Sequence, residues 1–295
     1  MIVVTAPTSQ IGGEVLRRLL QGAEQVRVVV RDPARLPEEV RSRVEVVQGS
    51  HADPAVVERA FDGADALFWL VPAAPAAPTI FDAYMGFALP AADAIRRHQV
   101  SRVVSVSALG AGVQTFAGHV SATLAMDALI RSTGANTREL ANPSFMDNML
   151  RDAASIRDRG VFTGTLPADL ALPTVATRDI GAAAATFLVD QTWTGQEIVP
   201  LLGAEDLSPN DQAKILTEVL GAPIRYEQGD REASKRRLMG FGMSEAVAGA
   251  LMAMDEAKEH GLDTAVPRTA ANTTPTTFRQ WATEVLKPAV EGAGR

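Results

Sequence analysis

The chain has 295 residues, of which 46% are hydrophobic and 21% charged, and a formal net charge of −7. These values are ordinary for a globular protein with a sizeable core, and the negative balance offers no basic face for nucleic acid or an anionic membrane. There are no cysteines, which excludes disulfides, thiol nucleophiles and cysteine-bound metals, and the scattered histidines predict no metal site.

Hydropathy predicts neither a targeting segment nor a membrane segment. The apolar run at the N-terminus covers only Met1 to Val4 and has no basic residues before it. No apolar stretch reaches the roughly 18 residues that a membrane span needs. We therefore expect a cytoplasmic protein whose partner is a small-molecule substrate, and a homodimer is the assembly that we consider.

The first half of the chain alternates short β-branched runs with amphipathic segments. Apolar runs at 2–5, 26–30, 44–47, 66–71 and 102–107 predict strands that are buried on both faces. The segments between them carry apolar residues every three or four positions and predict helices. This alternation is typical of right-handed βαβ units, so we predict an α/β fold with a Rossmann-type doubly wound parallel sheet.

The rhythm loosens after Gly134. "NTRELA" predicts a sixth strand and "EIVPLLG" another, whereas 160–173 reads as a Gly/Pro-rich stretch. Helices are expected at 208–220, 230–240, 244–260 and 276–287. We predict a core domain at 1–150, and the remaining core elements with a small, mainly helical C-terminal lobe at 151–295, as one integrated unit.

The stretch "TAPTSQIG" (5–12) joins the first strand to the first helix, where a doubly wound fold binds a dinucleotide pyrophosphate. Of the positions that usually carry glycine there, 6, 9 and 12, only Gly12 does. Ala6 adds a methyl group that a negative φ tolerates, and Ser9 adds a hydroxyl for phosphate, as do Thr5 and Thr8 nearby. The loop predicts either a modified NAD(P)-binding site or one that no longer binds a cofactor.

Arg31 follows the second strand, where NAD-dependent enzymes place an acidic residue on the ribose. A guanidinium group binds a 2′-phosphate, whereas a carboxylate repels it. Asp32 is positioned to reach the ribose instead, and Arg31 is alternatively a solvated residue at the end of a strand. On balance the predicted cofactor is NADPH in preference to NADH.

Six stretches resemble, in order, the NmrA-like family of atypical short-chain dehydrogenases: "TAPTSQIG", "VRVVVRDPARL", "RVVSVSALGA", "LIRSTGANTRELANPSFMDNML", "VATRDIGAAAATFL" and "LGAPIRYEQ". The resemblance runs from Ile2 to about Trp281. It implies a Rossmann fold with a small C-terminal lobe that commonly binds NADP(H). The family includes quinone and triphenylmethane-dye reductases, isoflavone-type reductases, and regulators that sense the nicotinamide pool.

The resemblance also implies roles for individual residues. The pyrophosphate would lie on the loop and the 2′-phosphate on Arg31, with Ser50 and His51 on the adenine side. Val71 and Pro72 would lie near a ribose, and Ser107 near the nicotinamide. With Thr5 added from the loop itself, the expected cofactor-binding residues are Thr5, Thr8, Ser9, Gln10, Ile11, Gly12, Arg31, Val71, Pro72 and Ser107.

A carbonyl substrate needs a proton donor as well as a hydride. Neither Tyr84 nor Tyr226 is followed by lysine four residues on, which excludes a classical Tyr–Lys pair. His119 is the candidate catalytic acid and Thr123 the candidate for positioning substrate or water. The alternatives are a solvent-exposed histidine and a hydroxyl bonded to its own helix. At Asp127 we expect a surface charge. Isoflavone-type relatives carry a catalytic lysine where this chain has Thr123, which speaks against that activity.

The stretch "PSFMDN" supplies Phe145, Met146 and Asn148, whose surfaces suit a flat conjugated ligand. Alternatively these residues belong to the core of the small lobe. Tyr84 is expected to face the substrate, and Trp69 to lie in the core.

Together these observations favour an NADPH-dependent reductase of a quinone or similar planar conjugated small molecule. Reduction of a quinone leaves a stabilised aromatic oxyanion, which demands less of a dedicated acid. Two alternatives stay open. One is a nicotinamide-sensing regulatory protein without turnover; the other is a non-redox cyclase or dehydratase with a degenerate cofactor loop, in which His119 and Asp127 are the acid–base candidates.

Overall fold

The computed structural model describes residues 1–292 and divides into two compact units. Unit 1 comprises Met1–Ala108, Ser121–Ala141 and Ile180–Val199. Unit 2 comprises Leu109–Val120, Asn142–Asp179 and Pro200–Arg295. Each unit therefore combines three separate stretches of the chain.

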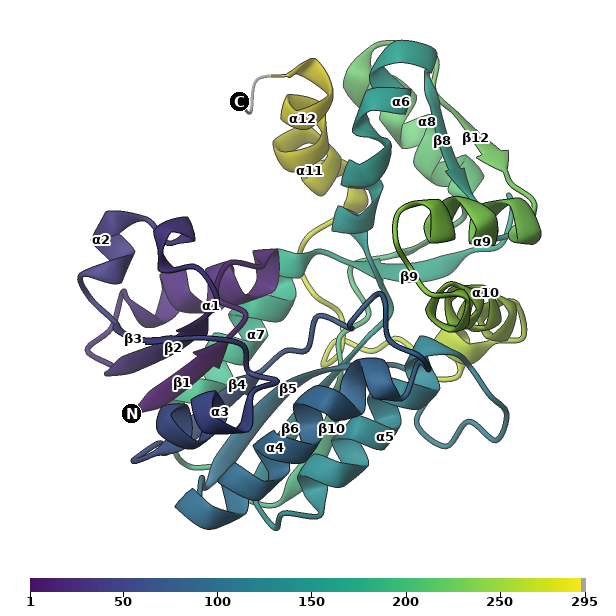
Figure 1. Cartoon of the computed structure of the whole chain (residues 1–295). Helices are drawn as coiled ribbons and strands as arrows, with labels where there is room; N and C mark the ends of the chain where they lie inside the picture. Colours follow the sequence, from purple (N-terminus) through teal and green to yellow (C-terminus); the bar gives the residue numbers. More distant parts are fainter. Residues whose placement is uncertain (293–295) are drawn as a thin grey trace. The chain divides into compact units, whose positions relative to one another are not determined.

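Unit 1 is built on a seven-stranded sheet with the order β10-β6-β5-β4-β1-β2-β3 (Figure 1). The strands are β1 (Ile2–Thr5), β2 (Val26–Val30), β3 (Glu45–Gln48), β4 (Ala66–Trp69), β5 (Arg102–Ala108), β6 (Asn136–Asn142) and β10 (Gln196–Pro200). The central strand β1 pairs in parallel with both β2 and β4, with Ile2 opposite Val26 and Ala66. The predicted doubly wound sheet is confirmed, and with it the predicted strands.

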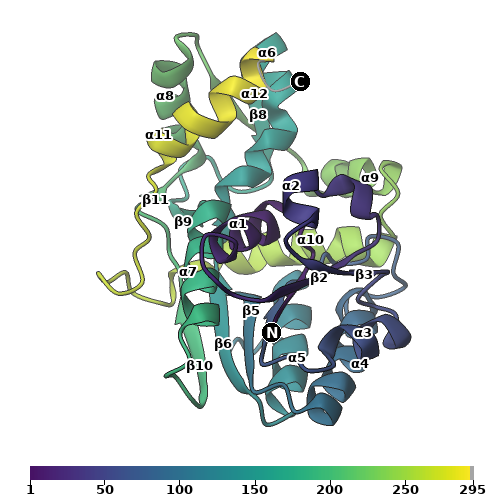
Figure 2. The ribbon, with the colours of Figure 1, turned by 90° about the vertical axis from the view of Figure 1, so that its left-hand side faces the viewer.

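Helices cover both faces of this sheet. They are α1 (Gln10–Leu19), α2 (Glu38–Arg41), α3 (Pro54–Phe61), α4 (Asp82–His98), α5 (His119–Arg131) and α7 (Thr177–Val189), with a 3-10 turn η1 (Pro33–Arg35). Helices α3, α4 and α5 lie over one face, and α1 and α7 over the other (Figures 1 and 2). Local sequence sets their starts: Asp53 accepts a hydrogen bond from the N–H of Ala55, and Pro54 occupies the first turn of α3.

One hydrophobic core of unit 1 lies between the sheet and the helices α3, α4 and α5. Val3, Leu67 and Trp69 of the strands are fully buried there, as are Phe61 and Ile95 of the helices. Burying side chains of this size contributes about 1.5–3 kcal/mol each. The apolar residues of the strands therefore stabilise the sheet, and the loops of the candidate site follow its strands.

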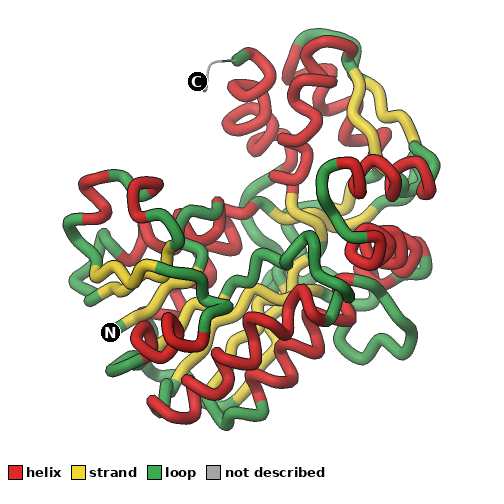
Figure 3. Tube along the Cα trace, in the orientation of Figure 1, coloured by secondary structure: helices red, strands yellow, loops and turns green. Residues whose placement is uncertain are grey.

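Unit 2 contains two small sheets, ordered β11-β9-β7 and β12-β8, and most of the C-terminal helices (Figure 3). Its elements are β7 (Ser144–Phe145), η2 (Met146–Asp152), α6 (Ala153–Arg159), β8 (Val161–Gly164), β9 (Leu172–Val175), β11 (Asp206–Leu207), α8 (Pro209–Leu220), β12 (Arg225–Gln228), α9 (Arg231–Gly240), α10 (Glu245–Glu259), η3 (Leu262–Thr264), α11 (Phe278–Trp281), η4 (Ala282–Leu286) and α12 (Lys287–Glu291). The four predicted helices are present, whereas the short strands β8, β9 and β12 were not predicted. No helix within residues 1–292 is long and apolar enough to cross a membrane.

Candidate functional site

The loop between β1 and α1 is closed by Ser9. Its side chain accepts a hydrogen bond from the N–H of Gly12 and donates one to the carbonyl oxygen of Ala6 at 2.8 Å. Ser9 is therefore the N-cap of α1. The expectation that its hydroxyl donates to phosphate is wrong for this conformation, because the proton is already used within the loop.

Ala6 has a φ of +48°. The condition under which its methyl group would be tolerated, a negative φ, is therefore not met. A left-handed conformation costs a residue with a Cβ about 1–2 kcal/mol relative to glycine. The loop thus keeps the backbone path of a glycine-rich turn without the glycine.

Two backbone N–H groups at the start of α1 donate no hydrogen bond within residues 1–292. The N–H groups of Ser9, Gly12 and Gly13 are hydrogen-bonded. Within residues 1–292, those of Gln10 and Ile11 have no acceptor. Unpaired N–H groups at a helix N-terminus are the usual ligands of an anion, and the helix dipole favours negative charge there.

Thr5 does not contribute to this cradle. It is fully buried, and its hydroxyl lies 3.0 Å from the carbonyl oxygen of Phe68 and accepts from the N–H of Leu70. The prediction that Thr5 binds the cofactor is therefore wrong, because its side chain fastens β1 to β4. Thr8 and Gln10, by contrast, are exposed.

Arg31 follows β2 directly and is exposed. Its guanidinium group has neither a hydrogen bond nor an ion pair to any of the described residues. Asp32 caps the turn η1 by accepting from the N–H of Ala34 at 3.0 Å, so its carboxylate is already engaged. The charge at this strand end is accordingly positive and available to a phosphate group.

The family resemblance implied that His51 lies on the adenine side of the cofactor. Its side chain is instead buried in unit 1. The ring centroid lies 5.5 Å from that of Trp69 and 4.7 Å from that of Phe87. The pKa of His51 is lowered to about 4, mainly because the ring is buried. A hydrogen bond to the backbone of Leu70 raises this pKa, and the charge of Arg31 lowers it. His51 is therefore a neutral member of the core.

Val71 and Pro72 follow β4. Val71 is half-buried against the core of unit 1, and Pro72 is exposed. Both remain candidates for contact with a ribose. Trp69, at the end of the strand, is fully buried as predicted.

Tyr84 of α4 is hydrogen-bonded to Thr123 of α5. Burial raises the pKa of Tyr84, the bond from Thr123 opposes that shift, and the charge of Asp127 adds to it. Two residues that were predicted separately, one for substrate and one for catalysis, thus form one polar pair in unit 1.

Ser107 forms the second polar pair of unit 1. Its hydroxyl donates to a carboxyl oxygen of Asp127 across 2.5 Å. Asp127 is 0% exposed, so the expectation of a surface charge there is wrong. Burial raises the pKa of Asp127 to about 7, although the bond from Ser107 lowers it.

The remaining predicted residues lie in unit 2. His119 is half-buried at the start of α5. Burial lowers its pKa, and a hydrogen bond to the backbone of Val247 raises it by a smaller amount. Phe145 is half-buried and Asn148 exposed, but Met146 is 3% exposed and packs in the hydrophobic core of the unit. Met146 thus belongs to the core of the small lobe, which is the alternative that we gave for it.

Lys258 of α10 is a buried cation that the sequence analysis missed. Its ammonium group donates to Ser144 at 2.8 Å and to Asp263 at 2.7 Å, and both Lys258 and Asp263 are almost completely buried. Ser144 directly precedes Phe145, so Lys258 fixes the start of the "SFMDN" segment. Asp255, Glu256 and Glu259 lie close to Lys258 in the sequence, so its surroundings there are those of a solvated charge and gave no signal of burial.

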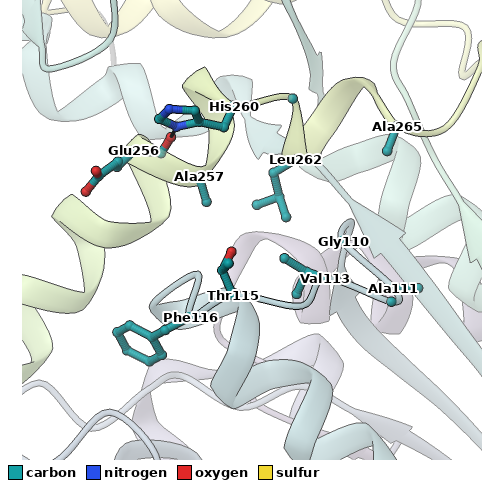
Figure 4. A pocket seen from close by; sticks show the side chains of 12 residues that line it. Gly110, Ala111, Val113, Thr115, Phe116, Glu256, Ala257, His260, Leu262 and Ala265 are labelled. Carbon is teal, nitrogen blue, oxygen red and sulfur yellow. Dashed lines mark hydrogen bonds between the residues drawn. The ribbon is translucent and has the colours of Figure 1, made fainter.

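Unit 2 also contains a cavity of about 630 Å³ between the loop after β5 and the end of α10 (Figure 4). Leu262, Val113 and Phe116 supply apolar surface, and Glu256 and His260 supply polar groups. Phe116 is 55% exposed. The volume lies in the range of small-molecule sites, which is about 300–1,000 Å³. Within residues 1–292, no group of three or more acidic or histidine side chains is arranged to bind a metal.

The model of the NmrA-like family matches residues 1–282. The chain belongs to the NmrA-like family. The match covers the loop, both polar pairs of unit 1 and most of unit 2, so the predicted family resemblance is confirmed.

Relatives of this NmrA-like protein include reductases. It is 32% identical to the (4-alkanoyl-5-oxo-2,5-dihydrofuran-3-yl)methyl phosphate reductase of Streptomyces griseus, over 96% of this chain and 97% of the relative. It is 27% identical to the NAD(P)H azoreductase of Xenophilus azovorans, over 85% of each chain. Among solved structures, the NADPH-dependent quinone oxidoreductase of Escherichia coli complexed with NADPH matches with a TM-score of 0.77 and 21% identity, over 100% of each chain.

Proposed function

We propose that the protein is an NADPH-dependent reductase of a quinone or a similar planar conjugated small molecule. The observation that carries the proposal is the exposed guanidinium group of Arg31 at the end of β2, which has no ionic partner in the described part of the chain. A reductase that uses NADPH needs a cation for the 2′-phosphate at this strand end. The curated relatives, which are reductases by name, support the same activity.

The residues of the first loop fit a dinucleotide. The N–H groups of Gln10 and Ile11 lack protein acceptors within residues 1–292 and would bind the pyrophosphate. The backbone approaches closely at Gly12, where a Cβ would lie 2.2 Å from the carbonyl oxygen of Ala6. Exposed Thr8 and Gln10 add donors at the rim. When bound, NADPH supplies the hydride; the residues of this chain bind and orient the reactants.

The substrate class follows from what the quinone oxidoreductase and the Streptomyces relative have in common. A quinone and the alkanoyl-oxo-dihydrofuran of the Streptomyces relative both contain a carbonyl group that is conjugated to a carbon–carbon double bond. Hydride addition to such a compound leaves a negative charge on oxygen. Phe116, Val113 and Leu262 give the cavity of unit 2 the apolar surface that a planar acceptor needs, and we include this cavity in the proposal as its binding surface.

The first test is binding. Titration of the protein with NADPH and NADH, followed by the fluorescence of the reduced cofactor, is expected to show saturable binding with a lower Kd for NADPH. Absence of binding would remove the reductase proposal and favour the cyclase or dehydratase alternative. Binding that is accompanied by no consumption of NADPH with any acceptor would favour the nicotinamide-sensing regulator.

The second test is turnover with a panel of benzoquinones, naphthoquinones, azo dyes and an acylated dihydrofuranone. We expect NADPH consumption with at least one class. Phe116→Ala is expected to raise the KM for that acceptor and to leave the Kd of NADPH unchanged. Location in the cytoplasm, where reduced nicotinamide is regenerated, and assembly as a homodimer belong to the same proposal; light scattering tests the assembly.

A further inference from the structure

Asp127 of α5 lies beneath two serines of one strand. Ser107 donates to one of its carboxyl oxygens across 2.5 Å, and Ser105 donates to the other across 3.4 Å. The two serines are two residues apart on β5, so their side chains share one face of the strand. The carboxyl group is 0% exposed, and water cannot replace either bond.

The cation whose charge acts on Asp127 is ion-paired with another residue. Arg131, one turn further along α5, forms an ion pair with Glu139 of β6 across 2.5 Å. Around Asp127, the charge of Glu139 raises its pKa and that of Arg131 lowers it, while burial is the largest cause of its rise to about 7. From α4, Tyr84 is the titratable group within electrostatic reach, and its own pKa is raised. Asp127 therefore changes its protonation state close to neutral pH.

The hydrogen bond between Asp127 and Ser107 couples that state to the direction of a hydroxyl group. Only one hydrogen lies between the two bonded oxygens, and either group can supply it. When the carboxyl group is ionised, the hydroxyl of Ser107 donates to it. When the carboxyl group is protonated, it donates to Ser107, and the hydrogen of Ser107 is released for another acceptor. Ser107 lies near the carboxyl end of β5, and ligands of doubly wound folds bind at that edge of the sheet.

We propose that Asp127 is a positioning residue that makes Ser107 the proton donor to the oxygen of the reduced substrate. The inference rests on the proposed reductase function. Reduction of a quinone consumes one hydride and one proton for each hydroquinone formed, and the reduced nicotinamide is oxidised. The hydroxyl of Ser107 gives its proton to the substrate oxygen and takes the proton of Asp127 in the same step. Asp127 is left ionised. After the product leaves, it regains a proton through the hydroxyl of Ser107, by the reverse of the same relay.

The decisive measurement is the pH profile of kcat/KM in Asp127→Asn. In the wild-type protein we expect kcat/KM to fall as the pH rises through about 7, because the donor state of Asp127 is lost. The amide group of the variant does not titrate, so the fall should disappear and the rate should drop by roughly 100-fold, as for the loss of a proton donor. Asp127→Glu is expected to restore a titration. A profile in Asp127→Asn that matches the wild-type profile would overturn the proposal.

Two further variants separate this role from a structural one. Ser107→Ala should lose the same inflection as Asp127→Asn, since both act on one proton. Asp93→Asn removes a carboxylate of α4 that is exposed and ion-paired with Arg96, and it should keep both rate and profile. The Kd of NADPH, measured by titration, should be the same in Asp127→Asn and the wild type. If it rises in parallel with the loss of rate, the role of Asp127 is structural and the proposal fails.

An infrared titration distinguishes failure of this inference from failure of the proposed function. A protonated buried carboxyl group gives a carbonyl band that Asp127→Asn should remove. The band should lose intensity as the pH rises through about 7. A carboxyl group that is ionised throughout this range overturns the inference even if the protein is a reductase. Absence of turnover with every acceptor defeats the proposed function, while the infrared band still reports the protonation state of Asp127.

Discussion

A Cβ atom on Gly12 would lie 2.2 Å from the carbonyl oxygen of Ala6, far inside van der Waals contact. That oxygen accepts hydrogen bonds from both the N–H and the hydroxyl group of Ser9, which limits its freedom to move. Close approach of the backbone, not an unusual φ, is why position 12 requires glycine. Position 6 has the opposite property: its φ is positive, and the residue is alanine.

Gly12→Ala is expected to lower the free energy of unfolding by about 1–3 kcal/mol, the usual cost of overpacking. It should also weaken NADPH binding at least tenfold, because the Ala6 carbonyl must move and the loop moves with it. Chemical denaturation and fluorescence titration measure the two effects. Gly13→Ala is the matched control, since its Cβ would meet only the oxygen of Pro7 at 3.6 Å. Equal behaviour of the two variants would contradict the explanation.

Ala6→Gly is expected to stabilise the protein by about 0.5–1 kcal/mol, because glycine adopts a positive φ without strain and this gain exceeds the added entropy of the unfolded chain. A rise in Tm is the readout. Ala76→Gly is the control: Ala76 is exposed and has no positive φ, so glycine there should lower Tm. A fall in Tm for Ala6→Gly would show that the methyl group makes contacts that outweigh the strain.

Arg31→Glu should exchange the cofactor preference. A carboxylate repels the 2′-phosphate and can bind ribose hydroxyls, so the Kd of NADPH is expected to rise at least tenfold while that of NADH stays within about threefold, in line with the typical energy of a charge-assisted bond. Parallel titrations with both cofactors give the ratio. Arg41→Glu replaces an arginine that is paired with Glu38 at 2.8 Å and should leave the ratio unchanged.

The buried His51 and Asp127 should make opposite contributions to the pH dependence of stability. The pKa of His51 is lowered to about 4, so the unfolded chain takes up a proton first as the pH falls below about 6.5, and stability decreases down to about pH 4. The pKa of Asp127 is raised to about 7, so stability decreases as the pH rises from about 4 to about 7. The limits are about 3 kcal/mol for His51 and about 4 kcal/mol for Asp127, at roughly 1.4 kcal/mol for each unit of pKa.

Single variants should therefore reveal slopes that largely cancel in the wild type. In His51→Phe, the free energy of unfolding is expected to fall with rising pH between about 4 and 7; in Asp127→Asn, it should rise. Urea denaturation at several pH values measures both slopes, and Asp93→Asn, at an exposed site on α4, should keep the wild-type profile. The same slope in all four proteins would refute the assigned pKa shifts.

The strands of unit 1 could be predicted from the sequence because their signal is local. Runs such as Ile2–Thr5 and Val26–Val30 are apolar throughout, and a strand buried on both faces requires that composition. The small strands β8 and β12 carry no comparable signal. They are four residues long and their pairing joins Val161 to Arg225, far apart in the chain, so tertiary contacts decide their conformation.

The role of a site residue could be predicted only where it depends on the residue itself and its immediate neighbours in the sequence. Arg31 is such a residue, since its charge and its place after a strand are both visible in the sequence. Asp127 is different: its burial depends on hydroxyl groups that Ser105 and Ser107 supply from another strand. His51 likewise depends on the rings of Trp69 and Phe87. Polar residues were assigned to the surface or to a ligand because their buried partners lie elsewhere in the chain.

The interleaving of the two units has a consequence for biosynthesis. When the ribosome has released the first 150 residues, six of the seven strands exist, and β6 still presents an open edge because β10 spans Gln196–Pro200. The stretches of unit 2 that have emerged by then lack the helices from α8 onward. Neither unit can finish folding on the nascent chain until well past the midpoint of translation. We therefore expect truncation at any point before β10 to yield an aggregation-prone product.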